Sequence, residues 1–107
     1  QQRAIFPLAA LTIFVNFGLV HARERWAAAA VAANVNKDEQ MEVLRLCCVI
    51  KPLVTWLAER VGTVCRERTG GQGYLSINAF GSVIGFAHAG ITAEGDNVRR
   101  TRILQLF

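Results

Sequence analysis

Long apolar stretches separated by short polar breaks dominate the pattern of residues along this chain. The first, residues 4–22, reads AIFPLAALTIFVNFGLVHA and carries no charged residue. The alanine-rich stretch that follows has high helix propensity, so together they predict one helix from about Gln2 to Ala33. Residues 34–40 form the first polar break, and a second helix is expected from Lys37 to about Arg68.

The second helix has a recognisable start and an internal proline. Asn36 is placed to cap its first turn, with Glu39 three residues later in the capping-box position. Pro52 lacks a backbone donor and is expected to kink the helix. One apolar stripe is expected along it, formed by Met41, Leu44, Cys48, Leu57, Val61 and Val64. Two long helices joined by a short break form an antiparallel hairpin, the beginning of an up-and-down bundle.

Loops alternate with shorter apolar segments in the rest of the chain. Their order is a loop over 69–76, an apolar segment over 77–89, a second loop over 90–97 and a last short helix over 98–107. Asp96 or Asn97 is the expected cap of this last helix. Gly81 and Gly85 stand four residues apart, which favours close packing on a neighbouring helix over contact with a flat ligand. The predicted fold class is all-α, an up-and-down helical bundle with residues 1–107 as one domain.

Residues 4–22 also meet the minimum length of a membrane span. Against this interpretation stand Pro7, Asn16, Gly18 and His21. Polar residues at the centre of a span are costly, although uncharged ones are not prohibitive. The run also continues directly into the charged residues 23–25. A helix buried on most of its faces within a soluble protein produces the same pattern. We favour the buried helix and keep the membrane span as the alternative.

Composition and charge narrow the function classes. Apolar residues make up 52% and charged residues 19% of the 107 residues, which fits one folded domain. The net charge of +4 comes from basic residues that are scattered or gathered at Arg99, Arg100 and Arg102. Because no basic stripe alternates with aromatic residues, we expect no nucleic-acid partner. The three arginines are expected at a solvated or partner-facing surface, with a phosphate-rich ligand as the alternative.

Three cysteines are present, Cys47, Cys48 and Cys65. Their odd number and the adjacent pair indicate reduced thiols in an intracellular compartment. Together with His21 and His88 they do not reach the spacing of a zinc site, so no metal is expected. The chain begins with Gln1 and shows no recognisable targeting signal, which leads us to expect a fragment, a processed product or a remnant of a longer protein.

Candidate chemistry is concentrated in residues 69–97. A glycine cluster comes first, made of Gly70, Gly71 and Gly73 and followed by Tyr74. Such a density of glycine lets the backbone approach a ligand closely. Glu94 lies in a glycine-flanked loop after an apolar run, which makes its carboxylate a candidate general base. On spacing alone, a plain turn and a solvated loop carboxylate stay open as alternatives.

Two motifs stand in a fixed order within this segment, TGGQGYLSIN at 69–78 and HAGITAEGDN at 88–97. Together they resemble the C-terminal helical domain of the acyl-CoA oxidases, flavoenzymes related to the acyl-CoA dehydrogenases. The start of the chain and the Lys51-Pro52-Leu53 triplet are similar to bundle helices of the same family. The order and spacing of the two loops carry the resemblance, which covers most of the chain up to Asn97.

The resemblance implies a reaction and a set of site residues. A fatty acyl-CoA would lie over the flavin of FAD, and Glu94 would remove the α-proton while a hydride leaves the β-carbon for the flavin, giving a trans-2-enoyl-CoA. In an oxidase, O2 then reoxidises the flavin and hydrogen peroxide forms. The backbone N–H of Glu94, with Gly95, would polarise the thioester carbonyl. The residues expected to contact FAD are Gly70, Gly71, Gly73, Tyr74, Asp96 and Asn97.

The resemblance also implies a homodimer or larger assembly that shares FAD sites, and a peroxisomal location with mitochondrion or plastid as alternatives. The sequence departs from the family pattern at Ala79, where an Arg is common, and at the unusually basic residues 98–102. The family's N-terminal helical domain and middle β-domain are not among these residues. A non-catalytic structural or accessory subunit of a larger, membrane-associated complex is therefore the alternative function.

Overall fold

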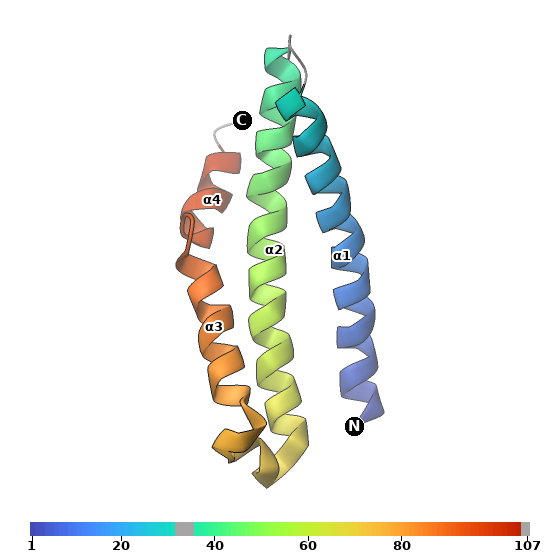
Figure 1. Cartoon of the computed structure of the whole chain (residues 1–107), viewed down its shortest axis with the longest axis vertical. Coiled ribbons are helices and arrows are strands. Elements are labelled where there is room, and N and C mark those ends of the chain that lie inside the picture. Colours follow the sequence, from blue (N-terminus) through green and yellow to red (C-terminus); the bar gives the residue numbers. More distant parts are fainter. Residues whose placement is uncertain (32–35, 106–107) are drawn as a thin grey trace.

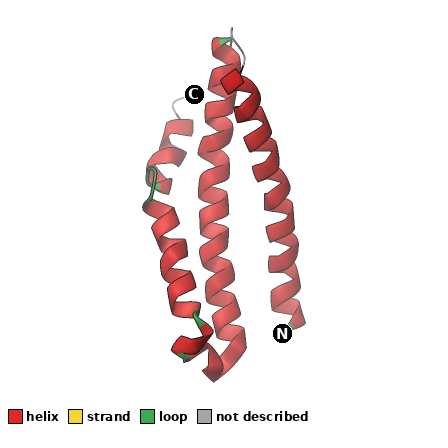
Figure 2. Ribbon diagram, in the orientation of Figure 1, coloured by secondary structure: helices red, strands yellow, loops and turns green. Residues whose placement is uncertain are grey.

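The computed structural model describes residues 1–31 and 36–105, and the regular structure within them is helical (Figure 2). The elements in chain order are α1 (Gln2–Val31), α2 (Lys37–Thr69), the short 3-10 helices η1 (Gly70–Tyr74) and η2 (Ser76–Asn78), α3 (Phe80–Thr92) and α4 (Asn97–Leu104). No strand occurs in the described residues, and the predicted all-α class is confirmed. The parts of the predicted elements that fall at 32–35 and 106–107 lie outside the described residues.

Helix α2 is the centre of the arrangement. Figure 1 shows α1 on one side of it and α3 with α4, placed end to end, on the other side. α1 and α2 run antiparallel, and Gln1 Nε2 donates a hydrogen bond of 3.0 Å to the Arg68 carbonyl oxygen at the far end of α2. α3 then returns along α2, so the predicted up-and-down arrangement is confirmed. The result is a long, narrow molecule with extents of 56 × 24 × 24 Å.

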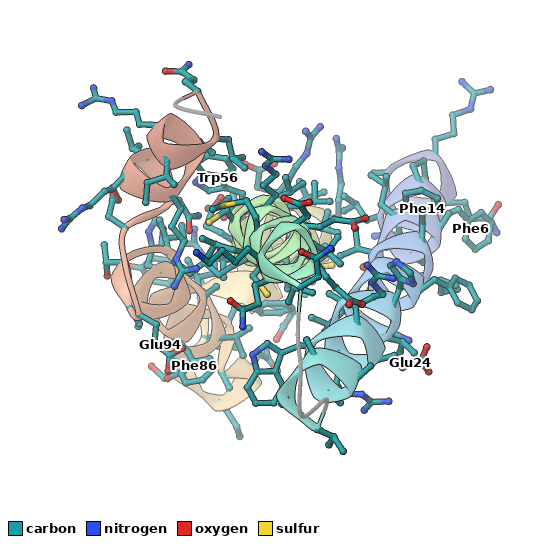
Figure 3. All side chains as sticks on the ribbon, turned by 90° about the horizontal axis from the view of Figure 1, so that it is seen from above. Phe6, Phe14, Glu24, Trp56, Phe86 and Glu94 are labelled. Atoms are coloured by element: carbon teal, nitrogen blue, oxygen red, sulfur yellow. The ribbon has the colours of Figure 1, made fainter. Side chains whose placement is uncertain are left out.

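Helix α1 packs against α2 through a narrow stripe. Its buried residues Leu8, Val15 and Ala22 are spaced seven apart, the repeat expected where one helix lies along another. Large apolar side chains elsewhere on the helix are exposed, among them Phe6, Ile13, Phe14 and Phe17. Figure 3 shows Phe6 on the side of α1 that faces away from α2. The prediction that this helix is buried on most of its faces is wrong for the described residues, because only α2 packs along it.

The length and composition of α1 would allow it to cross a membrane. Its most apolar window has 11% of its residues buried, which leaves an apolar face uncovered by the described residues. Core helices of soluble proteins and signal sequences pass the same test of length and hydropathy. The membrane alternative therefore stays open on this observation.

Helix α2 buries residues toward both of its neighbours. Asn36 is its N-cap, and the Asn36 side-chain oxygen accepts from the Asp38 N–H at 3.3 Å, as predicted, without a reciprocal bond from Glu39. Its buried residues are Val43, Cys48, Ile50, Pro52 and Gly62. The predicted single stripe is incorrect, because a helix with neighbours on two sides buries two faces, and Leu44 of that stripe is 46% exposed. α2 continues through Pro52 as one helix, and the kink there stays a prediction.

Glycines bring the helices together at positions other than the predicted ones. A Cβ at Gly18 would lie 3.1 Å from Ile50 Cδ1, and a Cβ at Gly62 would lie 3.1 Å from Ile84 Cγ1. The missing side chain of Gly18 thus allows α1 and α2 to pack closely, and that of Gly62 allows α2 and α3 to do the same. Gly81 and Gly85 are exposed, and a Cβ added at either position would meet no further atom within 4 Å, so their expected role in packing is not found within this chain.

Candidate functional site

The loop between α3 and α4 holds Glu94 in an unusual backbone conformation. Glu94 has a φ of 54° and Gly95 a φ of 100°, both in the left-handed region. A non-glycine residue pays a steric cost there and keeps the conformation only when its surroundings impose it. The Glu94 side chain is exposed within this chain (Figure 3). The structure therefore presents the candidate base on a backbone turn that other residues must hold.

Lys51 holds this turn from α2. Its Nζ donates three hydrogen bonds, to the Ile91 carbonyl oxygen at 3.0 Å, the Gly95 carbonyl oxygen at 2.8 Å and Asn97 Oδ1 at 2.7 Å. An ammonium group has three donors, so all of them are used here. The Ile91 carbonyl belongs to the last turn of α3, where unpaired carbonyls and the helix dipole favour a cation. One side chain thus joins the end of α3, the loop and the start of α4.

Asn97 completes the support beneath the loop. It is fully buried, at 0% exposure, and its Nδ2 donates to Thr55 Oγ1 at 2.9 Å while its Oδ1 accepts from Lys51. Thr55 Oγ1 in turn donates to the Lys51 carbonyl oxygen at 2.9 Å. The network is closed, because no buried side-chain polar atom of the described residues is left without a partner.

Arg100 of α4 bonds the second backbone carbonyl of the turn, that of Glu94. Its Nε donates to the Glu94 carbonyl oxygen at 3.2 Å, and its Nη2 donates to the same oxygen. This arginine was expected at a solvated or partner-facing surface, and it instead folds back over the loop. Asp96 caps α4, with its carboxylate accepting from the Val98 N–H at 3.2 Å.

Sequence reasoning identified this loop but missed the residues that support it. Lys51, Thr55 and Arg100 were not among the candidate site residues. The one available signal was a lone lysine between Ile50 and Pro52 in an apolar stretch, where a charge needs a specific partner.

The glycine loop is a tight turn at the end of α2. Gly70 is the C-cap of α2 at a φ of 68°, and neither Gly70 nor Gly71 has another atom within 4 Å of where a Cβ would be. Gly73 is buried, and a Cβ there would lie 2.5 Å from the Arg66 carbonyl oxygen. Tyr74 is 82% exposed. Two of the three glycines thus present open backbone, and the third is required by contact with α2.

The two predicted groups of site residues do not meet within one chain. Residues 94–97 lie at the C-terminal end of α3, and residues 70–74 lie next to its N-terminal end. At 1.5 Å per residue, the helix between them is about 20 Å long. Any shared ligand must therefore be elongated, or each loop must contribute to a separate site.

A small hollow lies beside the open glycine loop. This hollow of about 250 Å³ is lined by Arg66, Glu67, Gly70, Gly73 and Tyr74. The exposed Gly70 backbone and the Arg66 guanidinium favour an anionic group there, whereas the Glu67 carboxylate disfavours one. The backbone at this hollow can therefore approach an anionic group, such as a phosphate, closely.

Gly73 and Gly71 allow the folding role of this loop to be separated from a ligand role. We expect Gly73→Val to lower the stability of the full-length protein by about 3 kcal/mol, because the new side chain collides with the Arg66 carbonyl. Gly71→Val meets open space and should leave stability unchanged. Thermal unfolding of both variants tests this. Equal stability of Gly73→Val and the unmodified protein would contradict the steric argument.

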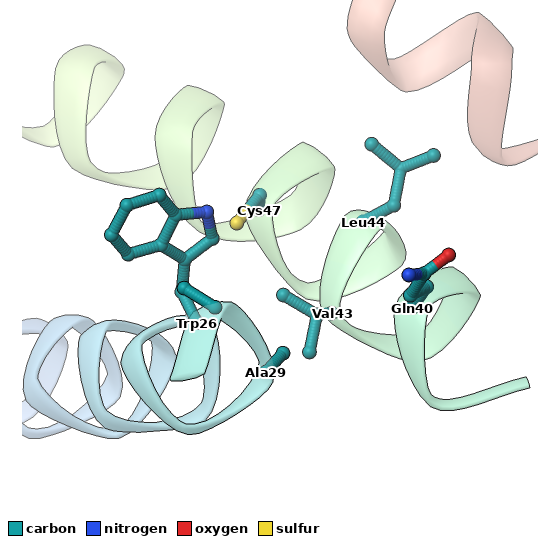
Figure 4. A pocket seen from close by; sticks show the side chains of 7 residues that line it. Trp26, Ala29, Gln40, Val43, Leu44 and Cys47 are labelled. Carbon is teal, nitrogen blue, oxygen red and sulfur yellow. The ribbon is translucent and has the colours of Figure 1, made fainter. Parts of the chain in front are cut away.

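Two apolar grooves occur elsewhere. One of about 420 Å³ lies between the C-terminal part of α1 and the start of α2, where Trp26 stands beside Cys47 and Val43 (Figure 4). Another of about 490 Å³ lies among α1, the second half of α2 and the first turn of α3, and its lining includes Val15, Gly62 and Phe80. No group of three or more metal-ligating side chains occurs in residues 1–31 and 36–105.

Comparison with known proteins was made for the whole chain. The family model described as acyl-CoA oxidase, C-alpha1 domain, matches residues 1–102. The chain is 33% identical over 99 residues to "Acyl-coenzyme A oxidase 2, peroxisomal" of Arabidopsis thaliana, a match that covers 91% of this chain and 14% of that protein. It is 38% identical over 56 residues to "Peroxisomal acyl-coenzyme A oxidase 3" of Homo sapiens, covering 52% of this chain and 8% of that protein. The chain thus spans a small part of the curated relatives it matches, and no solved structure matches it.

Proposed function

The chain belongs to the acyl-CoA oxidase C-alpha1 domain family, and from this premise we propose that it forms the C-terminal helical part of an enzyme that oxidises fatty acyl-CoA to trans-2-enoyl-CoA. The observation that carries the proposal is the conformation of Glu94, held at a φ of 54° by hydrogen bonds from Arg100 and, through Gly95, from Lys51. A carboxylate on a strained and supported turn is a feature typical of functional sites.

Glu94 is the base in this proposal. The α-proton of a thioester is weakly acidic, so its removal needs a positioned carboxylate and stabilisation of the enolate charge that develops on the carbonyl oxygen. The Glu94 carboxylate takes the α-proton, and the backbone N–H groups of Glu94 and Gly95 are the donors toward the carbonyl oxygen. Exposure of Glu94 within this chain supports a site completed by other residues that exclude water.

Bound FAD would supply the hydride acceptor for the β-hydrogen and, in an oxidase, the transfer of electrons to O2. The exposed backbone of Gly70 and Gly71, with the exposed ring of Tyr74, is assigned to the phosphate part of FAD. Gly73 holds this loop against α2. Asp96 and Asn97 were expected to contact FAD; the buried Asn97 side chain supports a role beneath the loop instead.

The separation of the two loops along α3 supports an assembly in which different subunits share FAD sites. We propose a homodimer or larger assembly with acyl-CoA as its substrate, and no nucleic-acid partner. Both relatives are named as peroxisomal, which supports a peroxisomal location, with mitochondrion and plastid as the alternatives. Residues 1–107 act as one helical domain of this assembly.

The flavin absorbance spectrum of the natively purified full-length protein tests the proposed function. We expect a flavin band that bleaches when a fatty acyl-CoA is added under anaerobic conditions, with a stoichiometric yield of enoyl-CoA. A saturated acyl-CoA analogue without an α-proton is the control and should leave the band unchanged. A colourless protein, or a flavin band that acyl-CoA does not bleach, would overturn the proposal.

The exposed apolar face of α1 favours a second candidate function. Phe6, Phe14 and Phe17 are between 65% and 72% exposed, and exposed apolar patches mark protein or membrane interaction sites. In this function the chain is a non-catalytic structural subunit of a larger, membrane-associated complex, and other components of that complex cover the exposed face of α1. A protein without flavin that purifies only as part of such a complex would support this function over the enzyme.

A further inference from the structure

We propose that Lys51 is a positioning residue for Glu94, which it holds through the backbone of the loop. This inference rests on the proposed function, because it takes the Glu94 carboxylate to be the base. The side chain of Lys51 lies on α2, more than 40 residues before Glu94 in sequence, and its ammonium group bonds the Gly95 carbonyl directly after the base.

Saturation of the ammonium group gives the first argument. The three acceptors come from the end of α3, the loop and the first residue of α4, at 3.0, 2.8 and 2.7 Å. A group bonded on three sides by separate elements fixes their relative positions, whereas a single bond would leave the loop free to swing. All three N–H donors of the Lys51 ammonium are used in these bonds, so a bond to a ligand would have to replace one of them.

The backbone conformation gives the second argument. The carbonyls of Glu94 and Gly95 are each bonded by a cation, the first by Arg100 from α4 and the second by Lys51 from α2. The φ of 54° at Glu94 is unfavourable without such bonds. Loss of the bond to Gly95 lets the turn relax toward ordinary φ values, and that relaxation moves the Glu94 side chain and its N–H together.

Lys51→Met in the full-length protein tests the inference, because Met keeps the length of the side chain and removes the donors. We expect kcat for acyl-CoA oxidation to fall about 100-fold with little change in KM, as for a misplaced catalytic group. Amide hydrogen exchange should quicken at residues 93–97 and stay unchanged along α1. Lys37→Met is the matched control, since it makes the same change on the exposed first turn of α2 and should alter neither measurement.

A double variant distinguishes this inference from the proposed function. If Lys51 acts through Glu94, adding Lys51→Met to Glu94→Gln should lower the residual rate by less than threefold. A full 100-fold further loss in the double variant would overturn the positioning role. An unchanged kcat of the Lys51→Met single variant, together with an inactive Glu94→Gln, would also overturn it. Normal turnover of Glu94→Gln would instead overturn the proposed function itself.

Lys51→Arg is the substitute test if the Lys51→Met variant does not fold, because arginine keeps the positive charge beneath the loop. The planar guanidinium cannot reach three acceptors arranged around one ammonium nitrogen. We expect a folded protein with kcat lowered about 10-fold and faster exchange confined to residues 93–97. Unchanged kcat and exchange in this variant would show that charge alone suffices and would overturn the three-bond positioning.

Discussion

Glu94→Gln is expected to lower kcat for acyl-CoA oxidation by about 10⁴-fold in the full-length protein, the upper range for loss of a general base. The amide has nearly the same shape as the carboxylate, so the turn at φ 54° and its bonds from Arg100 and Lys51 should persist. What is lost is the ability to accept the α-proton. Anaerobic flavin bleaching by stopped flow measures the affected step directly.

Glu24→Gln is the matched control for this variant. Glu24 is exposed on α1, far from the α3–α4 loop, and makes no hydrogen bond or ion pair with the described residues (Figure 3). The same chemical change there should leave kcat and stability unchanged. If Glu94→Gln bleached its flavin at the rate of Glu24→Gln, Glu94 would not be the base.

Asn97→Leu is expected to have the largest effect on stability, a loss of about 3 kcal/mol or more. Leucine has the same number and branching of side-chain heavy atoms as asparagine, but it removes one acceptor from the Lys51 ammonium and the donor that bonds Thr55 Oγ1. A charged group left with an unsatisfied donor beside an apolar side chain pays a large desolvation cost. The α3–α4 loop should open before the rest of the helices.

The midpoint of urea unfolding, with amide exchange at residues 93–97, measures this loss. Asn16→Leu on the exposed face of α1 is the control and should shift stability by less than about 0.5 kcal/mol. Asn97→Asp retains an acceptor for Lys51 and loses the donor to Thr55, so its destabilisation should be smaller than that of Asn97→Leu. Equal midpoints for Asn97→Leu and Asn16→Leu would mean that the buried network contributes nothing to stability.

The sequence predicted much of the local structure. Helix propensity and apolar spacing located α1 and α2, and two caps, Asn36 and Asp96, stand where the polar pattern indicated. The loop motifs located the Glu94 turn and identified the family, which the match to residues 1–102 confirms. These features depend on residues that are near one another in sequence, so the amino-acid sequence alone is enough to predict them.

Burial was less well predicted than helix formation. The spacing of Leu8, Val15 and Ala22 decides which stripe of α1 faces α2, but apolar residues surround that helix on all sides and hide the stripe. Gly81 and Gly85 have the spacing of a packing motif and are exposed, while Gly18 and Gly62 make the close approaches. Which glycine meets a neighbouring helix depends on the rotation of each helix about its axis, and that rotation is decided by packing.

The sequence by itself therefore determined the helices, their order, the family and the loop that carries Glu94. Only the tertiary structure decided what holds that loop, because Lys51 and Asn97 are 46 positions apart and belong to different helices. Hydrogen bonds between residues so distant in sequence follow no period. A lone lysine in an apolar stretch indicates that a partner is needed but does not identify it. They exist only where the packing of α3 and α4 on α2 brings a buried amide within reach of an ammonium group, and so they become visible only once the chain is folded.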